Sequence, residues 1–477
     1  MTNDATPRGA VDGSFRKFIA SDKGRLALLF LIVLLSRIPF LSAGYGEHVD
    51  AWRIANTARH IAETHDYEVS RFPGYPVQEI ACAFLWKGGP VALNGASALF
   101  SAVAALLFAL IARKMGCRDY FVLALTLAFA PVVYVNSVTS KDYIWALAFT
   151  LGSFYSILRG KPLAAGICLG LAIGCRITSG VAALPLCLIL HGLTRDQRPA
   201  RKIAIFAIAS TVTALIVFLP VYMKYGTGFF HAYEQLYPDW RPIVHRATAE
   251  LWGTFGIFGF LVVLGGIMVR RLGKPPLPPM FRCAPFHVFA WVCAVVIYIA
   301  MFLRLPHHAA YLIPMLPFAL LLLARFSPRP AFMVFCVLVI IGSFVSFSPD
   351  GFSRGDIFKD HQQRLAITES IRNFLSFTER IPGKNVFVVG GWEPEITNIS
   401  PAPEHPGATY AYLLTAEELV HWIESGATIY YVSPDIRQFE IRVNHIDLAQ
   451  YGAKDVRAIF DKKMNAQKAQ QSLPPEK

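Results

Sequence analysis

The sequence predicts a mainly α protein: a polytopic transmembrane helical bundle of about eleven spans, followed by a small C-terminal α/β domain. Three observations lead to this fold class. Of the 477 residues, 54% are hydrophobic and only 16% are charged, whereas a soluble domain is closer to a quarter charged. The apolar residues recur in blocks of about 16–22, the length that crosses a bilayer core. From Pro349 onward the chain becomes polar.

Each apolar block is interpreted as one span, and the Pro and Gly residues inside several blocks are compatible with membrane helices. The expected spans are 26–43, 90–112, 120–137, 141–158, 162–177, 178–193, 201–222, 251–269, 286–303, 308–324 and 331–347. Together they form an expected transmembrane domain over residues 26–348. Because similar blocks follow the first one, that block is not simply a cleaved signal peptide.

Positive charge predicts the orientation of the chain. The net charge is +13, and alternate loops hold about twice as many Lys and Arg residues as the loops between them. Segments rich in Lys and Arg stay in the cytoplasm, so the N-terminal tail, residues 1–25, is expected inside and the loop after the first span outside. Lys and Arg residues in cytoplasmic loops therefore account for the positive net charge, and no nucleic-acid partner is expected. The eight Cys residues form no CxxC pair and are interpreted as packing residues.

An odd number of spans places the polar C-terminal segment outside as well. Within it, Asn385–Gly391 and Ala427–Ser433 are expected to form short buried strands. Thr415–Ser425 is expected to form a helix that begins with a capping box. We therefore expect an α/β domain at residues 349–460, followed by a disordered tail at residues 461–477.

The first outer loop, residues 44–89, is long for a connector, and long loops on a rigid scaffold are usually functional. From Ala51 its apolar residues recur at the spacing of one helix face. They are Ala51, Ile54, Ala55, Ala58 and Ile61. A helix with this pattern is expected to lie in the plane of the membrane surface.

The same loop continues into the segment SRFPGYP, in which Pro73, Gly74 and Pro76 predict a rigid turn. Arg71 stands just before this turn. The apolar stretch Ile80–Trp86 follows, and it is too short to span a membrane. It is expected to form a second surface helix.

With these features the chain resembles the C-fold glycosyltransferase superfamily, whose members include protein O-mannosyltransferases and aminoarabinose transferases. The resemblance covers the arrangement of the spans and the segments GEHVDAW, SRFPGYP, SKDY, CRITSG and HHAAYLIPMLP. It implies an enzyme that takes a sugar from a polyprenyl-phosphate donor on the outer face of the membrane. The sugar would pass, with inversion, to a hydroxyl or amine of a lipid, glycan or protein acceptor.

Two acids of the first outer loop are the expected catalytic groups. The resemblance implies that Asp50 is the base that removes the acceptor proton, with Glu47 as a second acid. The alternative is that Asp50 caps the surface helix and accepts a hydrogen bond from the backbone N–H of Arg53 or Ile54. The loop lacks an Asp-x-Asp or Asp-Glu pair, so a divalent cation, Mg or Mn, stays open as a cofactor.

Five basic residues at outer helix ends and loops are the expected ligands of the donor phosphate. They are Arg71, Arg176, Lys224, Arg241 and Arg304. For Arg176 the alternative is a side chain that reaches to the membrane surface, since a charge facing lipid costs about 2.5–3.5 kcal/mol. Lys224 and Arg241 lie in an aromatic loop, residues 223–250, which is either a lid over the phosphate or an inert membrane anchor.

Three further residues are expected to contact the acceptor or a metal ion: Asp142, His307 and Tyr311. For Asp142 the alternative is the N-cap of the helix that follows it. His307 and His308 are adjacent, so they do not form the i, i+4 pair of a zinc site.

Two other functions stay open at this point. A transporter or flippase of a lipid-linked sugar would favour inverted repeats and charges at mid-membrane, and the sequence shows no clear internal repeat. A non-catalytic membrane scaffold would leave the patterned first outer loop unexplained. No P-loop is present, so an ATP-driven pump is not expected. The expected location is the inner (plasma) membrane of a bacterium.

Overall fold

The computed structural model describes residues 21–194, 198–228, 237–272, 281–348, 351–400 and 407–456. Contacts divide the chain into two compact units: Met1–Gly46 with Thr57–Gln362, and Glu47–Asn56 with Gln363–Lys477. The division thus falls after Gln362, and a short part of the first outer loop groups with the C-terminal unit. The expected tail at residues 461–477 and most of the N-terminal tail lie outside the described residues.

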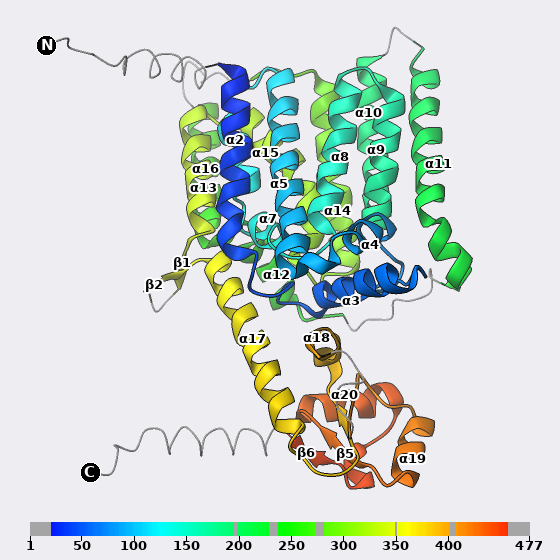
Figure 1. The fold of residues 1–477 in the computed structure, drawn as a ribbon. Helices are drawn as coiled ribbons and strands as arrows, with labels where there is room; N and C mark the ends of the chain where they lie inside the picture. Colours follow the sequence, from blue (N-terminus) through cyan, green and yellow to red (C-terminus); the bar gives the residue numbers. More distant parts are fainter. Residues whose placement is uncertain are drawn as a thin grey trace, which may run out of the picture. The chain divides into compact units, whose positions relative to one another are not determined.

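The first unit is a helical bundle whose long helices run side by side (Figure 1). Its helices are α2 (Asp22–Arg37), α4 (Pro76–Ala83), α5 (Gly89–Lys114), α6 (Tyr120–Ala128), α7 (Pro131–Asn136), α8 (Tyr143–Leu158), α9 (Pro162–Cys175), η3 (Ile177–Ala182), α10 (Ala183–Leu193), α11 (Pro199–Tyr225), α12 (Trp240–Ala247), α13 (Ala249–Leu272), α14 (Pro285–Arg304), η5 (Ala309–Met315), α15 (Leu316–Phe326) and α16 (Arg329–Gly342). Helix α3 (Val49–Thr64) has its first turns in the second unit and its last turns in the first.

The expected apolar blocks are helical over most of their length, which confirms a mainly α, polytopic membrane fold. The last block, 331–347, is helical only to Gly342. Among the described residues, five helices are long and apolar enough to cross a membrane. They are Trp86–Lys114, Pro199–Tyr225, Ala249–Leu272, Pro285–Arg304 and Ala309–Phe326. Shorter apolar helices, such as α8, α9 and α16, pack among them.

The span expected at residues 120–137 is instead two helices, α6 and α7. Pro131, the first residue of α7, has no backbone N–H and cannot continue the hydrogen-bond ladder of α6. The fully buried Arg37 donates to the carbonyl of Ala128, at the end of α6, and to Oγ of Ser137 at 3.1 Å. The guanidinium therefore satisfies a carbonyl that the break leaves without a helical partner.

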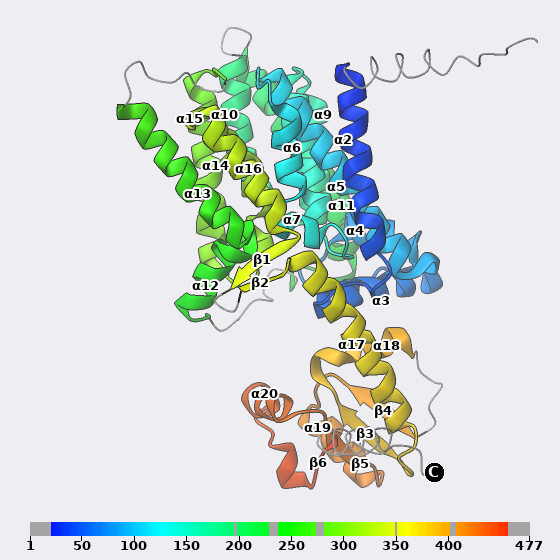
Figure 2. The same ribbon diagram turned by 90° about the vertical axis from the view of Figure 1, so that its left-hand side faces the viewer.

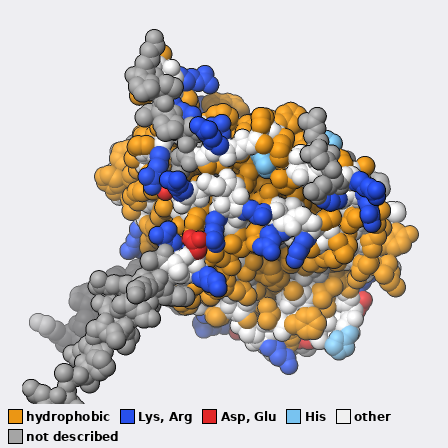
Figure 3. Space-filling model, turned by 90° about the horizontal axis from the view of Figure 1, so that it is seen from above, with side chains coloured by type: hydrophobic (Ala, Val, Ile, Leu, Met, Phe, Trp, Pro, Cys, Tyr) orange, Lys and Arg blue, Asp and Glu red, His pale blue; other side chains and the backbone are white. Residues whose placement is uncertain are grey.

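A short antiparallel hairpin follows α16. Strand β1 (Val345–Ser348) pairs with β2 (Gly351–Arg354), and Figure 2 shows the pair beside the lower ends of α13 and α16. Phe352 of β2 is 75% exposed, and its ring stacks on Phe255 of α13. Figure 3 looks onto the opposite end of the bundle, where many Lys and Arg side chains and few Asp and Glu side chains are visible.

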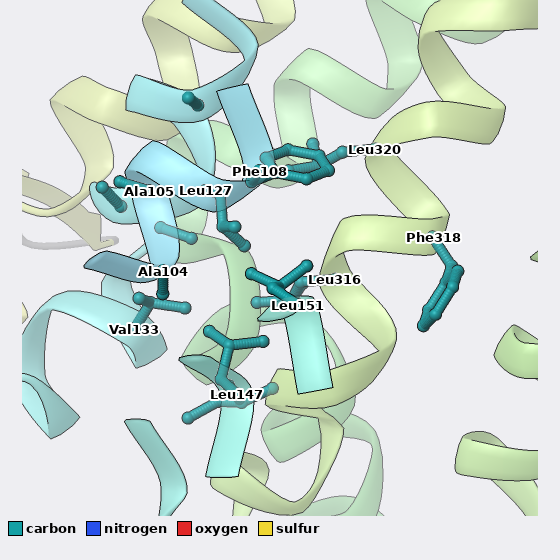
Figure 4. Packing of buried hydrophobic residues seen from close by; sticks show 14 of the residues in the cluster. Ala104, Ala105, Phe108, Leu127, Val133, Leu147, Leu151, Leu316, Phe318 and Leu320 are labelled. Carbon is teal, nitrogen blue, oxygen red and sulfur yellow. The ribbon is translucent and has the colours of Figure 1, made fainter. Parts of the chain in front are cut away.

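The core of the bundle lies between α5, α6, α8 and α15. Figure 4 shows part of this cluster, with Phe108 of α5 near Leu320 of α15 and Leu151 of α8 near Leu316. These side chains are fully or almost fully buried.

Helix α9 approaches α11 and α4 closely through Gly166, Gly170 and Gly174. A Cβ added at Gly170 would lie 2.4 Å from the side chain of Thr213, on α11. A Cβ at Gly174 would lie 2.5 Å from the side chain of Val77, on α4. Small residues at this spacing allow helices in membranes to pack closely, and here they hold the short helix α4 against α9.

The second unit contains a four-stranded parallel sheet with the strand order β4-β3-β5-β6. Its elements are β3 (Asn385–Val388), α18 (Glu393–Ile399), β4 (Ala408–Ala411), α19 (Ala416–Glu424), β5 (Thr428–Tyr431), α20 (Pro434–Asn444) and β6 (Lys454–Asp455), and most of α17 (Asp356–Thr378) precedes them. The two strands expected from the sequence are present but shorter. The expected capping box of α19, between Thr415 and Glu418, is formed.

Candidate functional site

Asp142 joins two arginines that lie far from it in the sequence. Its Oδ1 accepts a hydrogen bond from Nη2 of Arg71 at 2.7 Å, and its Oδ2 accepts one from Nη1 of Arg176, also at 2.7 Å. The Asp142 side chain is fully buried, and the two arginine side chains are only 12% and 13% exposed. We call these three residues the Asp142 cluster. The sequence predicted each of them as a site residue, and the structure brings them together.

Tyrosine rings cover both guanidinium groups of the cluster. Cζ of Arg176 lies 4.3 Å from the ring centroid of Tyr143 and 4.7 Å from that of Tyr311. Cζ of Arg71 lies 4.1 Å from the ring centroid of Tyr75. Such contacts stabilise a cation by about 0.5–2 kcal/mol. Within the cluster, two guanidinium groups therefore share one carboxylate.

Helix ends position the members of the cluster. Asp142 directly precedes α8, but its side chain makes no capping hydrogen bond, so its carboxylate is used by the arginines. Arg176 follows α9 in an extended conformation, with φ −160° and ψ 113°. A cation is favoured there by the dipole of α9, whose negative end it faces. Tyr311 is supplied by η5.

The fully buried Asn94 of α5 anchors the start of the first outer loop. Its Nδ2 donates to the carbonyls of Leu41 and Gly44, both at 2.9 Å, and its Oδ1 accepts from Oγ of Ser140 at 2.7 Å. The backbone N–H of Ser140 donates to the carbonyl of Tyr45 at 2.9 Å. The chain leading into the loop is therefore tied to the turn that carries Asp142.

Sequence analysis missed Asn94 and also Glu79, a fully buried acid of α4. The carboxylate of Glu79 accepts hydrogen bonds from Tyr67, Ser70 and Tyr75, on both sides of Arg71. The sequence signal that could have found them is a polar residue in an otherwise apolar stretch. Such a residue is usually buried together with hydrogen-bond partners, so it indicates a buried polar contact.

Lys224 lies outside the Asp142 cluster. Its Nζ is 2.5 Å from Oδ2 of Asp66, and this hydrogen bond lowers the pKa of Asp66. The neighbouring Tyr225 packs edge-on against Phe72 and accepts a hydrogen bond from the backbone N–H of Val69 at 3.4 Å. The end of α11 thus supports the segment that carries Arg71. Whether Lys224 also contacts phosphate stays a prediction.

Three other predicted residues lie on peripheral segments of the first unit. Arg304 is exposed at the end of α14, and Arg241 is exposed on α12, with its guanidinium over the Trp240 ring. His307 lies between α14 and η5, where burial and the nearby Arg246 lower the pKa of its imidazole from the usual range. Phosphate or acceptor contacts of Arg304, Arg241 and His307 remain predictions.

Glu47 and Asp50 belong to the second unit. Oδ2 of Asp50 lies 3.4 Å from Nδ1 of His48, and the Asp50 side chain is 15% exposed. Oε1 of Glu47 accepts a hydrogen bond from Nε2 of Gln363 at 2.7 Å. Because α3 begins at Val49, Asp50 stands inside the helix and not at its N-cap. Its expected role as base stays a prediction.

A divalent cation does not fit the carboxylate of Asp142. Both of its oxygens already accept hydrogen bonds from guanidinium groups, so a metal ion would have to displace an arginine and would be repelled by the guanidinium groups. Across the part of the chain that the structure describes, no group of three or more His, Cys, Asp or Glu side chains is arranged to hold a metal.

No protein-family model matches the chain, and no curated protein matches it in sequence. The structure is similar to two crystal structures of ArnT from Cupriavidus metallidurans, a C-fold aminoarabinose transferase. The structure with bound undecaprenyl phosphate has 14% identity and a TM-score of 0.53, covering 92% of this chain and 91% of that one. The apo structure has the same identity and TM-score, covering 91% and 95%. At this identity the likeness shows a shared fold, the C-fold predicted from the sequence.

Proposed function

We propose that this integral membrane protein is a glycosyltransferase that moves a sugar from a polyprenyl-phosphate donor to an acceptor hydroxyl or amine. The observation that carries the proposal is the Asp142 cluster, in which one buried carboxylate holds two almost buried guanidinium groups, those of Arg71 and Arg176, close together. The solved ArnT structure with undecaprenyl phosphate supports the same class of donor.

The cluster suits a leaving phosphate. When the bond between the sugar and the phosphate breaks, the phosphate keeps the electron pair and gains negative charge, which nearby cations stabilise. Guanidinium groups donate in pairs to phosphate oxygens and are less strongly hydrated than ammonium groups. Asp142 holds Arg71 and Arg176 close together despite their mutual repulsion.

The remaining chemistry requires a base. In the proposed reaction Asp50 removes the acceptor proton, and the acceptor oxygen or nitrogen attacks the anomeric carbon as the phosphate departs. A single displacement of this kind inverts the configuration at that carbon. Glu47 is proposed as the second acid.

The distribution of charge supports a bacterial inner-membrane protein with a cytoplasmic N-terminus. The end of the bundle at which α2 begins carries many Lys and Arg side chains and few acids (Figure 3), as cytoplasmic ends do. On this orientation the Asp142 cluster and the C-terminal unit face the outside. We propose that the C-terminal unit contributes to the choice of acceptor.

Binding of undecaprenyl phosphate to the purified protein tests the proposal. We expect wild-type protein to bind it, and Arg71→Ala and Arg176→Ala to bind at least about tenfold more weakly, since each removes a charged hydrogen-bond donor. Arg329→Ala, which removes an exposed arginine paired with Asp119, is the matched control. Equal binding by all four proteins would contradict the proposed site. Carrier movement across proteoliposomes without sugar transfer would indicate a flippase.

A further inference from the structure

Glu79 is a fully buried carboxylate with four hydrogen-bond donors around it. Oε1 accepts from the backbone N–H of Ser70 at 2.8 Å and from Oγ of Ser70 at 2.6 Å. Oε2 accepts from the hydroxyl of Tyr67 at 2.5 Å and from the backbone N–H of Tyr75 at 3.0 Å. Burial raises the pKa of Glu79, and these hydrogen bonds oppose that rise.

An amide side chain cannot match this set of donors. Each oxygen of Glu79 faces one backbone N–H, which can donate but cannot accept. The NH2 group of a glutamine at either oxygen position would therefore set two donors against each other, because an amide nitrogen does not accept. A buried donor left without an acceptor is costly, so the arrangement depends on two acceptor oxygens and not only on the shape of the side chain.

The residues bound by Glu79 bracket Arg71. Ser70 directly precedes it, and Tyr75, whose ring lies against the Arg71 guanidinium, closes the turn. Within the turn, the N–H of Gly74 donates to the carbonyl of Arg71 at 2.8 Å, and Gly74 has a φ of +94°. Glu79 therefore fixes the backbone on both sides of Arg71.

Helix α4 also touches the element that ends in the second arginine. Val77, two residues before Glu79, packs on Gly174 of α9, and Arg176 follows the end of α9. Helix α4 is thus hydrogen-bonded to the turn that contains Arg71. It also packs against the C-terminal part of α9, the helix that Arg176 follows.

We propose that Glu79 is a positioning residue: its buried carboxylate orders the 67–75 turn so that Arg71 meets Asp142 and is available to the donor phosphate. The part of this inference that names the donor phosphate as the ligand of Arg71 rests on the proposed function. The part that concerns the ordering of the 67–75 turn does not depend on any ligand.

Hydrogen–deuterium exchange of the ligand-free protein tests the ordering. Glu79→Gln keeps the shape and removes the charge, and we expect the amide hydrogens of residues 67–75 to exchange about tenfold faster. Glu63→Gln changes the same charge at an exposed position of α3 and should leave this segment unchanged. Unchanged exchange in Glu79→Gln would overturn the inference.

Binding of undecaprenyl phosphate tests the link to Arg71. We expect Glu79→Gln to weaken binding about tenfold in the wild-type background and to have almost no further effect in the Arg71→Ala background. The same loss in both backgrounds would show that Glu79 does not act through Arg71 and would overturn the inference. If wild-type protein binds no polyprenyl phosphate, the proposed function fails, while the exchange experiment still decides the role of Glu79 in the turn.

Discussion

Nη1 of Arg176 lies 2.7 Å from Oδ2 of Asp142, and the same carboxylate holds Arg71 through its other oxygen. The Asp142 side chain is fully buried, and the two arginine side chains that share it are only 12% and 13% exposed. Arg71 comes from the first outer loop, Asp142 from the start of α8 and Arg176 from the end of α9, so this one carboxylate fastens three segments together.

Asp142→Asn is expected to destabilise the protein by about 3–5 kcal/mol, because it breaks a buried ion pair and leaves guanidinium groups without their counter-charge. Thermal unfolding in detergent measures the change. Asp119→Asn is the matched control, since Asp119 pairs with Arg329, whose side chain is 66% exposed, and such pairs contribute about 0–1 kcal/mol. Equal effects of the two substitutions would contradict the assignment of Asp142 as the central counter-charge.

Arg176→Lys is expected to raise the KM for the donor about tenfold, although it keeps the charge. A lysine cannot donate in a planar fork and loses the stacking on Tyr143 and Tyr311. Steady-state kinetics with a polyprenyl-phosphate sugar measure this. Arg304→Lys, at an exposed helix end, tests whether Arg304 is a phosphate ligand as the sequence predicted; a similar rise in KM would show that it is.

Removal of divalent metals with EDTA is expected to leave the rate of sugar transfer unchanged. The reason is that the cations at the Asp142 cluster are arginines, and both Asp142 oxygens are already used. The measurement is transfer with and without EDTA, followed by addition of Mg²⁺ or Mn²⁺. Loss of transfer that either ion restores would show that a metal site lies elsewhere in the protein.

Glu395 of α18 is expected to make the stability of the second unit depend on pH. The residue is 3% exposed, its Oε2 has no hydrogen-bond partner among the described residues, and burial raises its pKa to about 7. Below pH 4.5 the group is protonated in both folded and unfolded chains. As the pH rises from 4.5 to 7, only the unfolded chain loses the proton readily, so stability falls, by at most about 3 kcal/mol.

Thermal unfolding between pH 4.5 and 8.5 measures this effect. Glu395→Gln should reduce the fall and be more stable than wild type above pH 7. Glu417→Gln, at an exposed position of α19, should follow the wild-type curve. Parallel curves for wild type and Glu395→Gln would contradict the assignment.

The fold class could be predicted because span length and composition are properties of continuous segments. The break between α6 and α7 was not predicted, although Pro131 was visible, because membrane helices often tolerate Pro and the decisive partner, Arg37, lies far away in sequence. The grouping of Glu47–Asn56 with the C-terminal unit depends likewise on contacts between distant segments.

The candidate site was predictable residue by residue but not as a cluster. Arg71, Asp142, Arg176 and Tyr311 were each singled out, yet nothing in their spacing shows that they meet. Glu79 and Asn94 were missed because their roles depend on hydrogen bonds with residues that only the fold brings near them. Lys224 was expected at the phosphate, and the structure gives it a partner, Asp66, that the sequence did not suggest.

The most direct test of the central claim is sugar transfer by the purified protein from a panel of radiolabelled polyprenyl-phosphate sugars. Wild type, Asp50→Asn and Glu63→Gln would be measured side by side, the last as an exposed acid of the same loop. We expect transfer by wild type and Glu63→Gln, and a loss of about 10²–10⁴-fold in Asp50→Asn with donor binding retained, as removal of a general base predicts. Equal transfer by all three would contradict the role of Asp50, and no transfer from any donor would contradict the proposed function.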